Sequence, residues 1–382
     1  MVRCGIDRIQ EYPQFFQGKR LAMVTSVSGV TQDLRPSYAA FHERYPLMYI
    51  FSPEHGLHGH AGSNEDVQEQ EIDELTGARV VSLYSAGGGK HIPPELMARL
   101  DAVVYDIQDL GTRFYTFIST MIQVMESCSM AQKEMIILDR PALLGGDIVE
   151  GGLLDMEYSS FVGPYPLCTR YGMTVGELAK MVHRESGHCC KLTVIPCEGW
   201  TRSQMFPEFG SRWVSPSSAI RDFETALLYP GICIFEGTNL SEGRGTGKPF
   251  HFVGAPFVDG ERLSRAMNAR NLPGIGFSPA RVTPTSSKYK GQECGGVTLR
   301  VLNHRTAHPV QAGVILLYTI LELWPGKVEY TSCDWSERPL ISFLVGSGIF
   351  EGPLPPLEEL LAKWEENSAA FRQRKLSYHI YP

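Results

Sequence analysis

The sequence predicts an α/β protein with a parallel sheet in its first half, and three observations support this. Short apolar runs rich in β-branched residues alternate with amphipathic stretches from Lys19 to Arg140, which is the pattern of parallel strands joined by crossover helices. The runs are apolar on both faces, as strands covered on both sides are. The chain has 382 residues, and single cores usually stop growing at roughly 250–300 residues, so two domains are expected.

The elements of the first half follow from these runs. Five strands are expected at residues 21–25, 47–51, 79–83, 102–107 and 135–138, with helices near 37–44, 94–100 and 114–131. Glycines then interrupt the alternation between residues 144 and 165, which is typical of a loop or a boundary. We therefore expect a parallel-sheet domain at residues 1–150 and a smaller α/β domain at residues 151–382.

The second half resumes with a helix whose start is marked by a capping box. Thr174 precedes an amphipathic stretch and Glu177 lies three residues further on, so a helix is expected at residues 175–185. The remaining expected elements are a strand at 191–196, helices at 259–269 and 310–323, strands at 276–282 and 296–301, and a tail helix at 357–371.

Composition excludes several classes of partner. The 35 Lys and Arg residues are scattered among 42 Asp and Glu residues, for a net charge of -7, so no nucleic acid is expected as a partner. No apolar run approaches the roughly 18 residues of a membrane span, and no membrane partner is expected. The first residues lack a signal core, so we expect a cytoplasmic protein, or an exported one if a signal has been trimmed. The sequence leaves the oligomeric state open.

Carboxylates follow three of the predicted strands. Glu54 follows the second strand, Asp106 and Asp109 follow the fourth, and Asp139 follows the fifth. Ligands of open α/β sheets bind beyond the carboxyl ends of the strands, so we expect these groups at the site, with Glu54, Asp106 and Asp109 as candidates for catalysis. The alternative for the glycine-rich loop after Glu54 is a solvated surface loop.

The turn after the fourth strand has the composition of a sugar site. Gln108, Arg113 and Tyr115 supply an amide, a guanidinium and an aromatic ring beside the two carboxylates, and sugars bind such bidentate donors and aromatic faces. Arg140, after the fifth strand, adds a second guanidinium. The alternative is a helix capped by an aspartate, with Arg113 as a structural ion-pair partner.

A second candidate loop lies at residues 235–246. It contains Glu236, Asn239, Glu242 and Arg244 among several glycines, a composition that favours a binding loop facing the first domain across a cleft. The alternative is a surface loop held by its own hydrogen bonds.

A metal site is a further alternative. His55, His58 and His60 lie beside Glu54 and would suffice for a catalytic zinc in a metal-dependent hydrolase or deacetylase. The spacing is a weak signature, so no metal is included in the main prediction. No phosphate loop, dinucleotide motif or Gly-x-Ser-x-Gly elbow is present in the sequence. We therefore expect no nucleotide binding and no acyl-enzyme chemistry.

Five motifs together resemble a known family, the exo-β-N-acetylmuramidases of bacterial peptidoglycan turnover. The resemblance covers the whole chain. The motifs are Ser52-Pro53-Glu54-His55-Gly56 and the segments at residues 106–116, 138–146, 172–179 and 236–246.

The resemblance implies a Rossmann-like N-terminal domain, a smaller C-terminal α/β domain and an active-site cleft between them. It implies release of N-acetylmuramic acid from the non-reducing end of a disaccharide or glycan, without a cofactor. Glu54 falls on the glutamate expected to act as general acid. The second catalytic group is left open among Asp106, Asp109, Glu236, Glu242 and the substrate's own 2-acetamido oxygen.

The remaining polar residues of the motifs are expected to contact substrate. They are His55, Gln108, Arg113, Tyr115, Asp139, Arg140, Asn239 and Arg244. The lactyl carboxylate of N-acetylmuramic acid calls for a cation, for which Arg113, Arg140 and Arg244 are the candidates. Ala142 and Tyr171 depart from the family pattern, and such departures make a sugar-binding relative without catalysis the second alternative function.

Overall fold

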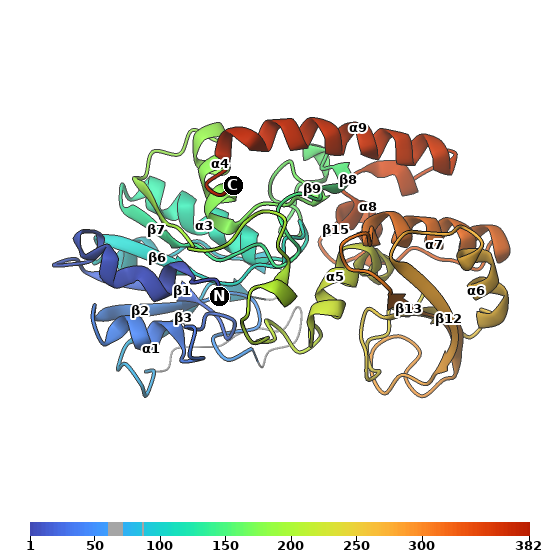
Figure 1. Ribbon diagram of the computed structural model, residues 1–382, viewed down its shortest axis with the longest axis horizontal. Coiled ribbons are helices and arrows are strands. Elements are labelled where there is room, and N and C mark those ends of the chain that lie inside the picture. The colour runs from blue at the N-terminus through green and yellow to red at the C-terminus, as the bar shows by residue number, and fades with distance from the viewer. Residues whose placement is uncertain (60–71, 86–87) are drawn as a thin grey trace. The chain divides into compact units, whose positions relative to one another are not determined.

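The structure is a computed structural model that describes residues 1–59, 72–85 and 88–382 (Figure 1). The chain forms two compact units. The first contains Met1–Ile148, Gly172–Ser218 and Gln373–Pro382, and the second contains Val149–Tyr171 and Ala219–Arg372. The expected division at residue 150 places residues 172–218 and 373–382 in the second domain, whereas they belong to the first compact unit.

The first unit is built on a six-stranded sheet with the order β10-β7-β6-β1-β2-β3. All neighbouring strands pair in parallel, which confirms the predicted sheet. The strands are β1 (Leu21–Thr25), β2 (Leu47–Ser52), β3 (Arg79–Ser82), β6 (Ala102–Asp106), β7 (Glu134–Leu138) and β10 (Leu192–Ile195). Strand β10 extends this sheet beyond the five strands expected, since it pairs with β7.

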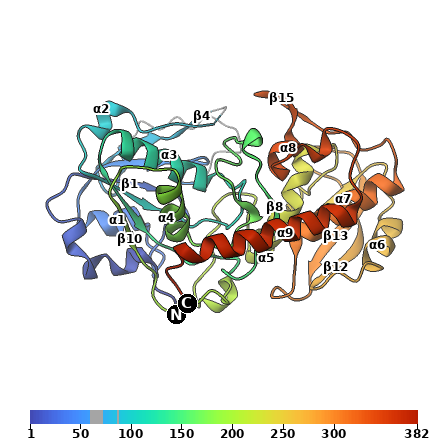
Figure 2. The same ribbon diagram turned by 90° about the horizontal axis from the view of Figure 1, so that it is seen from above.

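Helices connect these strands as crossovers. They are α1 (Ser37–His42), α2 (Pro94–Met97), α3 (Phe117–Met130) and α4 (Val175–Glu185). The chain passes from β1 to β2 in one direction across the sheet and from β6 to β7 in the other, so right-handed crossovers place α1 and α3 on opposite faces. Helices α3 and α4 pack side by side (Figure 2). The strand order reverses between β1 and β6, where open α/β sheets bind ligands.

Two details of these helices bear on the site. The capping box of α4 is confirmed, because the Thr174 hydroxyl accepts from the Glu177 N–H and the Glu177 carboxylate accepts from the Thr174 N–H. Helix α3 begins at Phe117, three residues after the expected start at residue 114. The intervening residues form a turn in which the Tyr115 N–H donates to the carbonyl of Thr112.

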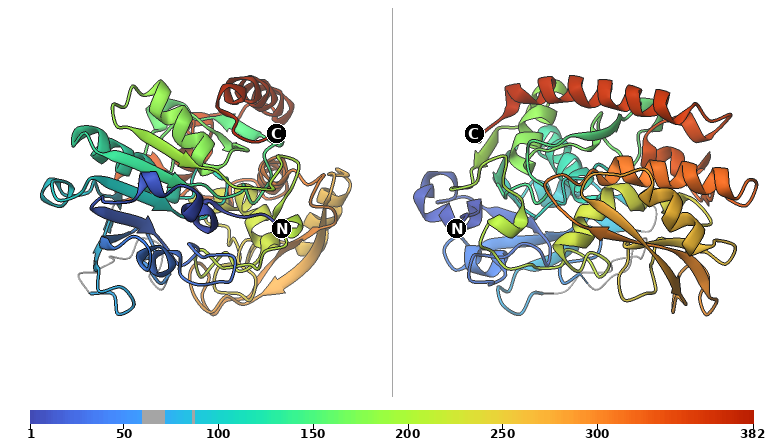
Figure 3. Two further views of the ribbon diagram at one scale, coloured as in Figure 1. Left: turned by 60° about the vertical axis from the view of Figure 1, so that its left-hand side comes forward. Right: turned by 45° about the vertical axis from the view of Figure 1, so that its right-hand side comes forward.

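The second unit has a three-stranded antiparallel sheet with the order β11-β13-β12 (Figure 3). Its strands are β11 (Phe252–Ala255), β12 (Ile275–Val282) and β13 (Cys294–Val301). Its helices are α5 (Phe223–Ile232), α6 (Gly260–Asn268), α7 (Pro309–Leu323) and α8 (Leu340–Val345), with α9 (Leu357–Lys375) belonging to this unit as far as Arg372. The predicted strands and helices at residues 259–371 are thus confirmed within a few residues.

Helix α5 was not expected, because Pro230 and Gly231 lie inside it and both residues ordinarily end helices. It forms because it packs closely on α7. A Cβ atom on Gly231 would lie 1.8 Å from the Pro309 carbonyl oxygen, and one on Gly313 would lie 2.0 Å from the Gly231 oxygen. The two glycines therefore permit a helix contact that a local pattern does not reveal.

Short pairs of strands and short 3-10 helices complete the fold. The pairs are β4 (Tyr84–Ser85) with β5 (Gly88–Gly89), β8 (Glu150–Leu153) with β9 (Cys168–Arg170), and β14 (Ser332–Cys333) with β15 (Ser336–Pro339). The 3-10 helices are η1 (Gly5–Glu11), η2 (Pro13–Phe15), η3 (Met156–Tyr158), η4 (Phe206–Glu208), η5 (Cys233–Gly237), η6 (Gly348–Phe350) and η7 (Leu376–Tyr378). Within the described ranges, every helix is too short or too polar to span a bilayer.

Candidate active site

Glu54 lies in a tight turn directly after strand β2. The Gly56 N–H donates to the carbonyl of Pro53 at 3.0 Å, and His55 adopts the left-handed region with φ 72°. Glu54 is only 6% exposed, and the Thr116 hydroxyl donates to its Oε2 at 2.5 Å. Its carboxyl group is therefore held by its own turn and by a hydroxyl that precedes helix α3.

Asp106 and Arg140 form a buried ion pair across the ends of the adjacent strands β6 and β7. Nε and Nη2 of Arg140 donate to the two carboxylate oxygens at 2.6 and 2.8 Å, and the two side chains are 0% and 4% exposed. Burial lowers the pKa of Arg140, but the charge and hydrogen bonds of Asp106 together with the nearby Cys4 and Asp7 raise it more, so this pKa lies above its ordinary value. Both oxygens of Asp106 are thus occupied by the guanidinium.

Asp109 and Gln108 connect the loops beyond the same two strands. Asp109 is buried, and its Oδ2 accepts from the Gly111 N–H at 2.6 Å. The Gln108 side-chain amide donates to the carbonyls of Asp109 and Pro141 at 3.2 and 2.9 Å. Gln108 therefore ties the loop after β6 to the loop after β7.

Arg113 and Tyr115 lie inside the same turn. Arg113 is among the largest fully buried side chains, and Tyr115 is 6% exposed. The Tyr115 ring packs edge-on against Phe117 with 4.9 Å between ring centroids. The side-chain types that suit a sugar site are therefore present at this strand end, but the side chains of Arg113 and Tyr115 are almost completely buried.

Asp139 is fully buried in a network with the C-terminal tail. Its Oδ2 accepts from the hydroxyls of Tyr381 and Thr174 at 2.5 and 2.7 Å, and its Oδ1 accepts from the N–H groups of Gly176 and Arg140. Burial raises the pKa of Asp139 to about 6, although these hydrogen bonds oppose the shift. Asp139 was predicted to contact substrate, and the structure surrounds it with protein donors.

The raised pKa of Asp139 predicts a pH-dependent stability. A group whose pKa is higher in the folded than in the unfolded chain stabilises the fold below its unfolded pKa, and this contribution is lost as the pH rises through the folded value. Between pH 4 and pH 7, Asp139→Asn should therefore gain roughly 3 kcal/mol of unfolding free energy relative to the parent protein. Urea unfolding at several pH values measures this. A difference independent of pH would contradict it.

The second unit gathers its own charged cluster in the loop at residues 235–246. Nε of Arg244 donates to Oε1 of Glu236 at 2.6 Å and lies 3.8 Å from Oε1 of Glu242. Glu242 is 1% exposed, and burial raises its pKa. The Arg244 guanidinium also lies 5.0 Å from the centroid of the Phe250 ring. Three of the four polar residues predicted for this loop are therefore in contact.

Asn239, the fourth predicted residue, has a different setting. Its side-chain amide donates to the Lys327 carbonyl at 2.9 Å and accepts from the Glu329 N–H at 3.1 Å. Its own N–H donates to the carbonyl of Glu329. Asn239 thus attaches the loop to the segment that follows α7.

Lys288 completes the cluster and was missed in the sequence. Its Nζ donates to Oε2 of Glu242 at 3.0 Å and to the carbonyls of Phe235, Glu236 and Leu240. Its neighbours in the chain, Ser287 and Tyr289, both adopt the left-handed backbone region, with φ 62° and 56°. Such conformations carry a cost for non-glycine residues and occur where the surroundings impose them. No periodicity marks this lysine, so only the folded chain reveals its role.

Replacing Lys288 with methionine should destabilise the second unit. The change leaves Glu242 and three carbonyl oxygens without their donor, and breaking a buried ion pair costs about 3–5 kcal/mol. Because Lys288 is 23% exposed, we expect the lower end of this range in urea unfolding. Lys290→Met is the control, since Lys290 is exposed. Equal effects of the two changes would contradict the prediction.

The histidines proposed for a metal lie only partly within the described structure. His55 is buried in the Glu54 turn, and His58 is exposed beyond it. His60 lies outside the described residues. Within residues 1–59, 72–85 and 88–382, no group of three His, Cys, Asp or Glu side chains is arranged to hold a metal ion.

Comparisons with known proteins agree with the motifs. The family model described as exo-beta-N-acetylmuramidase NamZ, N-terminal, matches residues 21–224, and its C-terminal counterpart matches residues 227–381. The peptidoglycan beta-N-acetylmuramidase NamZ of Bacillus subtilis (strain 168) is 36% identical over 386 aligned residues, which cover 100% of this chain and 91% of that protein.

Two solved structures are also similar to this chain. Both are DUF1343 family proteins from Bacteroides fragilis NCTC 9343. One has a TM-score of 0.90 at 30% identity and the other a TM-score of 0.76 at 29% identity, and each alignment covers 100% of this chain and 99% of the solved chain.

Proposed function

The chain belongs to the exo-β-N-acetylmuramidase NamZ family, and we infer from this that it is a glycoside hydrolase. We propose that it releases N-acetylmuramic acid from the non-reducing end of peptidoglycan-derived disaccharides or glycans. The observation in this chain that best supports the chemistry is Glu54, a buried carboxyl group held at a strand end by its turn and by Thr116.

Glu54 is the proposed general acid. Cleavage of a glycosidic bond requires a proton on the leaving oxygen as the bond to the anomeric carbon breaks. A general acid must be held within hydrogen-bond reach of that oxygen. The turn from Pro53 to Gly56 fixes the backbone at Glu54, and the Thr116 hydroxyl fixes one oxygen of its carboxyl group.

The candidates for the second catalytic group differ in how accessible their oxygen atoms are. Both oxygens of Asp106 bind Arg140, so Asp106 would have to break an ion pair to act. Asp109, Glu236, Glu242 and the substrate's 2-acetamido oxygen stay as candidates. Glu236 is also paired, with Arg244, but its side chain is 26% exposed whereas that of Glu242 is 2% exposed, which favours Glu236 over Glu242 for direct contact.

Arg244 is the proposed partner of the lactyl carboxylate. Arg113 and Arg140 are 0% and 4% exposed, and Arg140 already binds Asp106. The Arg244 side chain is 28% exposed, with its Nε on Glu236. Guanidinium groups recognise carboxylates through two parallel hydrogen bonds, and the partly exposed guanidinium is the more accessible one.

One incubation tests the activity and the mechanism together. N-acetylmuramyl-N-acetylglucosamine is mixed with the enzyme, and NMR identifies the first anomer of N-acetylmuramic acid. Release of the two monosaccharides is expected. The β anomer first would indicate retention, through a nucleophile or the acetamido oxygen, whereas the α anomer first would indicate a general base. Intact disaccharide would contradict the proposed function.

The two alternatives from the sequence are separated by simple measurements. A metal-dependent hydrolase would lose activity with EDTA and regain it with zinc. We expect the rate on a chromogenic N-acetylmuramide to be unchanged by EDTA. A sugar-binding protein without catalysis would bind the disaccharide, gain thermal stability from it and release no product.

A further inference from the structure

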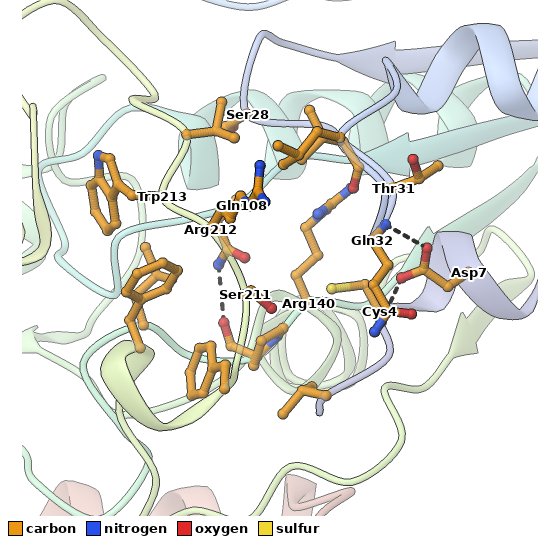
Figure 4. A pocket seen from close by; sticks show the side chains of 18 residues that line it. Cys4, Asp7, Ser28, Thr31, Gln32, Gln108, Arg140, Ser211, Arg212 and Trp213 are labelled. Carbon is orange, nitrogen blue, oxygen red and sulfur yellow. Dashed lines mark hydrogen bonds between the residues drawn. The ribbon is translucent and has the colours of Figure 1, made fainter.

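Two arginines that were predicted to contact substrate differ in how carboxylates hold them. In the first unit, Arg140 lies at the wall of a small cavity (Figure 4). Its Nε and Nη2 both donate to Asp106, and Nη2 also donates to the Val30 carbonyl. In the second unit, Arg244 donates to Glu236 through Nε alone. Nη1 and Nη2 of Arg244 donate no hydrogen bond within the described part of the chain.

A second carboxylate lies close to Arg244 without binding it. Oε1 of Glu242 is 3.8 Å from Nε of Arg244, which is beyond hydrogen-bond distance. The other oxygen of Glu242, Oε2, accepts from Nζ of Lys288 at 3.0 Å. Glu242 is 1% exposed, and burial raises its pKa while the charge of Lys288 opposes the shift. Lys288 is therefore the cation that occupies Glu242 in place of Arg244.

The position of Lys288 is fixed by several contacts. Its Nζ also donates to three backbone carbonyls of the loop at residues 235–246. In the same segment as the lysine, the N–H and the hydroxyl of Thr285 both donate to the Gly245 carbonyl at 2.8 Å. A Cβ atom on Gly245 would lie 2.3 Å from the Ser286 carbonyl oxygen. The segment and the loop are thus in close backbone contact, which holds the lysine in place.

The Arg244 guanidinium is held on one edge and one face. Glu236 accepts from its Nε at 2.6 Å, and the guanidinium lies 5.0 Å from the centroid of the Phe250 ring. The Phe250 N–H donates to the carbonyl of Glu242 at 2.7 Å, so the ring is tied to the same loop. The remaining edge carries Nη1 and Nη2, and two such nitrogens can bind a carboxylate through two parallel hydrogen bonds.

The charges of this cluster decide what that edge can bind. Glu236 and Glu242 carry two negative charges, and Arg244 and Lys288 carry two positive charges. Without Lys288, Glu242 would either turn toward Arg244 or leave two carboxylates beside one guanidinium. Both changes oppose an anionic ligand, because like charges repel and an occupied guanidinium has fewer N–H groups to donate.

We propose that Lys288 is a positioning residue for substrate selection, because it occupies Glu242 and so keeps the terminal nitrogens of Arg244 available to the lactyl carboxylate. The proposal rests on the proposed function, in which Arg244 binds this carboxylate. Lys288 acts through Glu242 and Arg244 and not by contact with the sugar. It determines how strongly the enzyme prefers a sugar that bears a carboxylate over the same sugar without the charge.

Two ligands that differ in one charge measure this preference. They are N-acetylmuramic acid and the methyl ester of its lactyl carboxylate, and ligand-observed NMR titration of the full-length protein gives the Kd of each. The ratio of the two Kd values is the preference for the charged ligand. We expect the parent protein to bind the acid about 10- to 100-fold more tightly than the ester, because hydrogen bonds to a charged group are the stronger ones.

Single variants then assign the preference to residues. Lys288→Met should lower the ratio by about 10-fold, the effect of one uncompensated charge beside a partly exposed guanidinium. Arg244→Met should abolish the preference. Lys290→Met is the matched control, since Lys290 is exposed, and it should keep the parent ratio. A merely structural role of Lys288 would weaken the binding of both ligands equally and leave the ratio unchanged.

A double variant tests the proposal even if Lys288→Met alone is too unstable to study. When Lys288→Met is combined with Glu242→Gln, no buried carboxylate is left without its partner, so the fold should recover stability. The competing charge beside Arg244 is also gone, and the preference for the acid should return toward the parent ratio. A folded double variant that keeps the low ratio would show that Lys288 does not act through Glu242, which contradicts the proposal.

The two proposals fail in different ways. Absence of turnover by the unaltered enzyme on every N-acetylmuramide would contradict the proposed function, while the Kd ratios would still test Lys288. Equal binding of both ligands by the parent protein would contradict the assignment of the lactyl carboxylate to Arg244 and, with it, the role of Lys288. A preference that is lost in Arg244→Met but kept in Lys288→Met would contradict the role of Lys288 alone.

Discussion

Glu54→Gln is expected to lower kcat on N-acetylmuramyl-N-acetylglucosamine by about 10²- to 10⁴-fold, the range typical of a lost general acid. Glutamine has the shape of the glutamate it replaces, and its amide oxygen can still accept from the Thr116 hydroxyl. The fold should therefore survive, while the proton for the leaving oxygen is lost. Turnover of the disaccharide and the unfolding free energy are the two measurements.

The leaving group provides a sharper test of this role. A general acid matters most when the leaving group is a poor one, because a good leaving group departs without protonation. Glu54→Gln should therefore retain much more activity on an aryl N-acetylmuramide with an acidic phenol than on the disaccharide. An equal loss on both substrates would contradict the assignment as acid, and full turnover on both would exclude Glu54 from the chemistry.

A matched control separates this effect from a general change of charge. Glu95 lies in α2 and is exposed, and Glu95→Gln removes the same charge from the same unit. It should leave both rates unchanged. Thr116→Val tests the support of Glu54, since it removes the hydroxyl that donates to Oε2, and it should give a smaller loss than Glu54→Gln.

Arg140→Met is expected to cost the first unit about 3–5 kcal/mol of unfolding free energy. The side chain is 4% exposed, and Asp106, at 0% exposed, would be left with a buried charge and no partner. Asp106→Leu should be costly for the same reason. The double variant should recover a large part of the loss, since no buried charge then remains. Urea unfolding of the four proteins forms a double-mutant cycle.

An exposed pair of the same geometry is the control for that cycle. Nε and Nη2 of Arg20 donate to the two oxygens of Asp101, as in the buried pair, but the side chains are 54% and 38% exposed. Arg20→Met should have a much smaller effect than Arg140→Met, because water replaces the lost partner. Equal losses would mean that burial does not determine the strength of the Asp106 pair.

Much of the fold could be predicted because its signals are local. Five strands of the parallel sheet appear as apolar runs, and the capping box of α4 lies within four consecutive residues. The position of Glu54 at a strand end also follows from one such run. The five motifs are local as well, and together they indicated the family.

Other features depend on residues far apart in the chain. Asp106 was a candidate catalytic group and Arg140 a candidate substrate ligand, and their pairing requires β6 and β7 to be neighbours. Asp139 binds Tyr381, 242 residues away. Lys288 reaches the loop at residues 235–246 from a segment without any periodic pattern. No local pattern marks these partners.

The sequence by itself therefore determined the parallel sheet, the order of the motifs and the strand end that carries Glu54, because periodicity, capping and turn formation act within a few residues. Only the tertiary structure decided which polar side chains bind one another, such as Asp106 with Arg140 and Glu242 with Lys288. A buried charge is stable only beside a partner, and that partner is supplied by whichever segment the packing of strands and helices brings near.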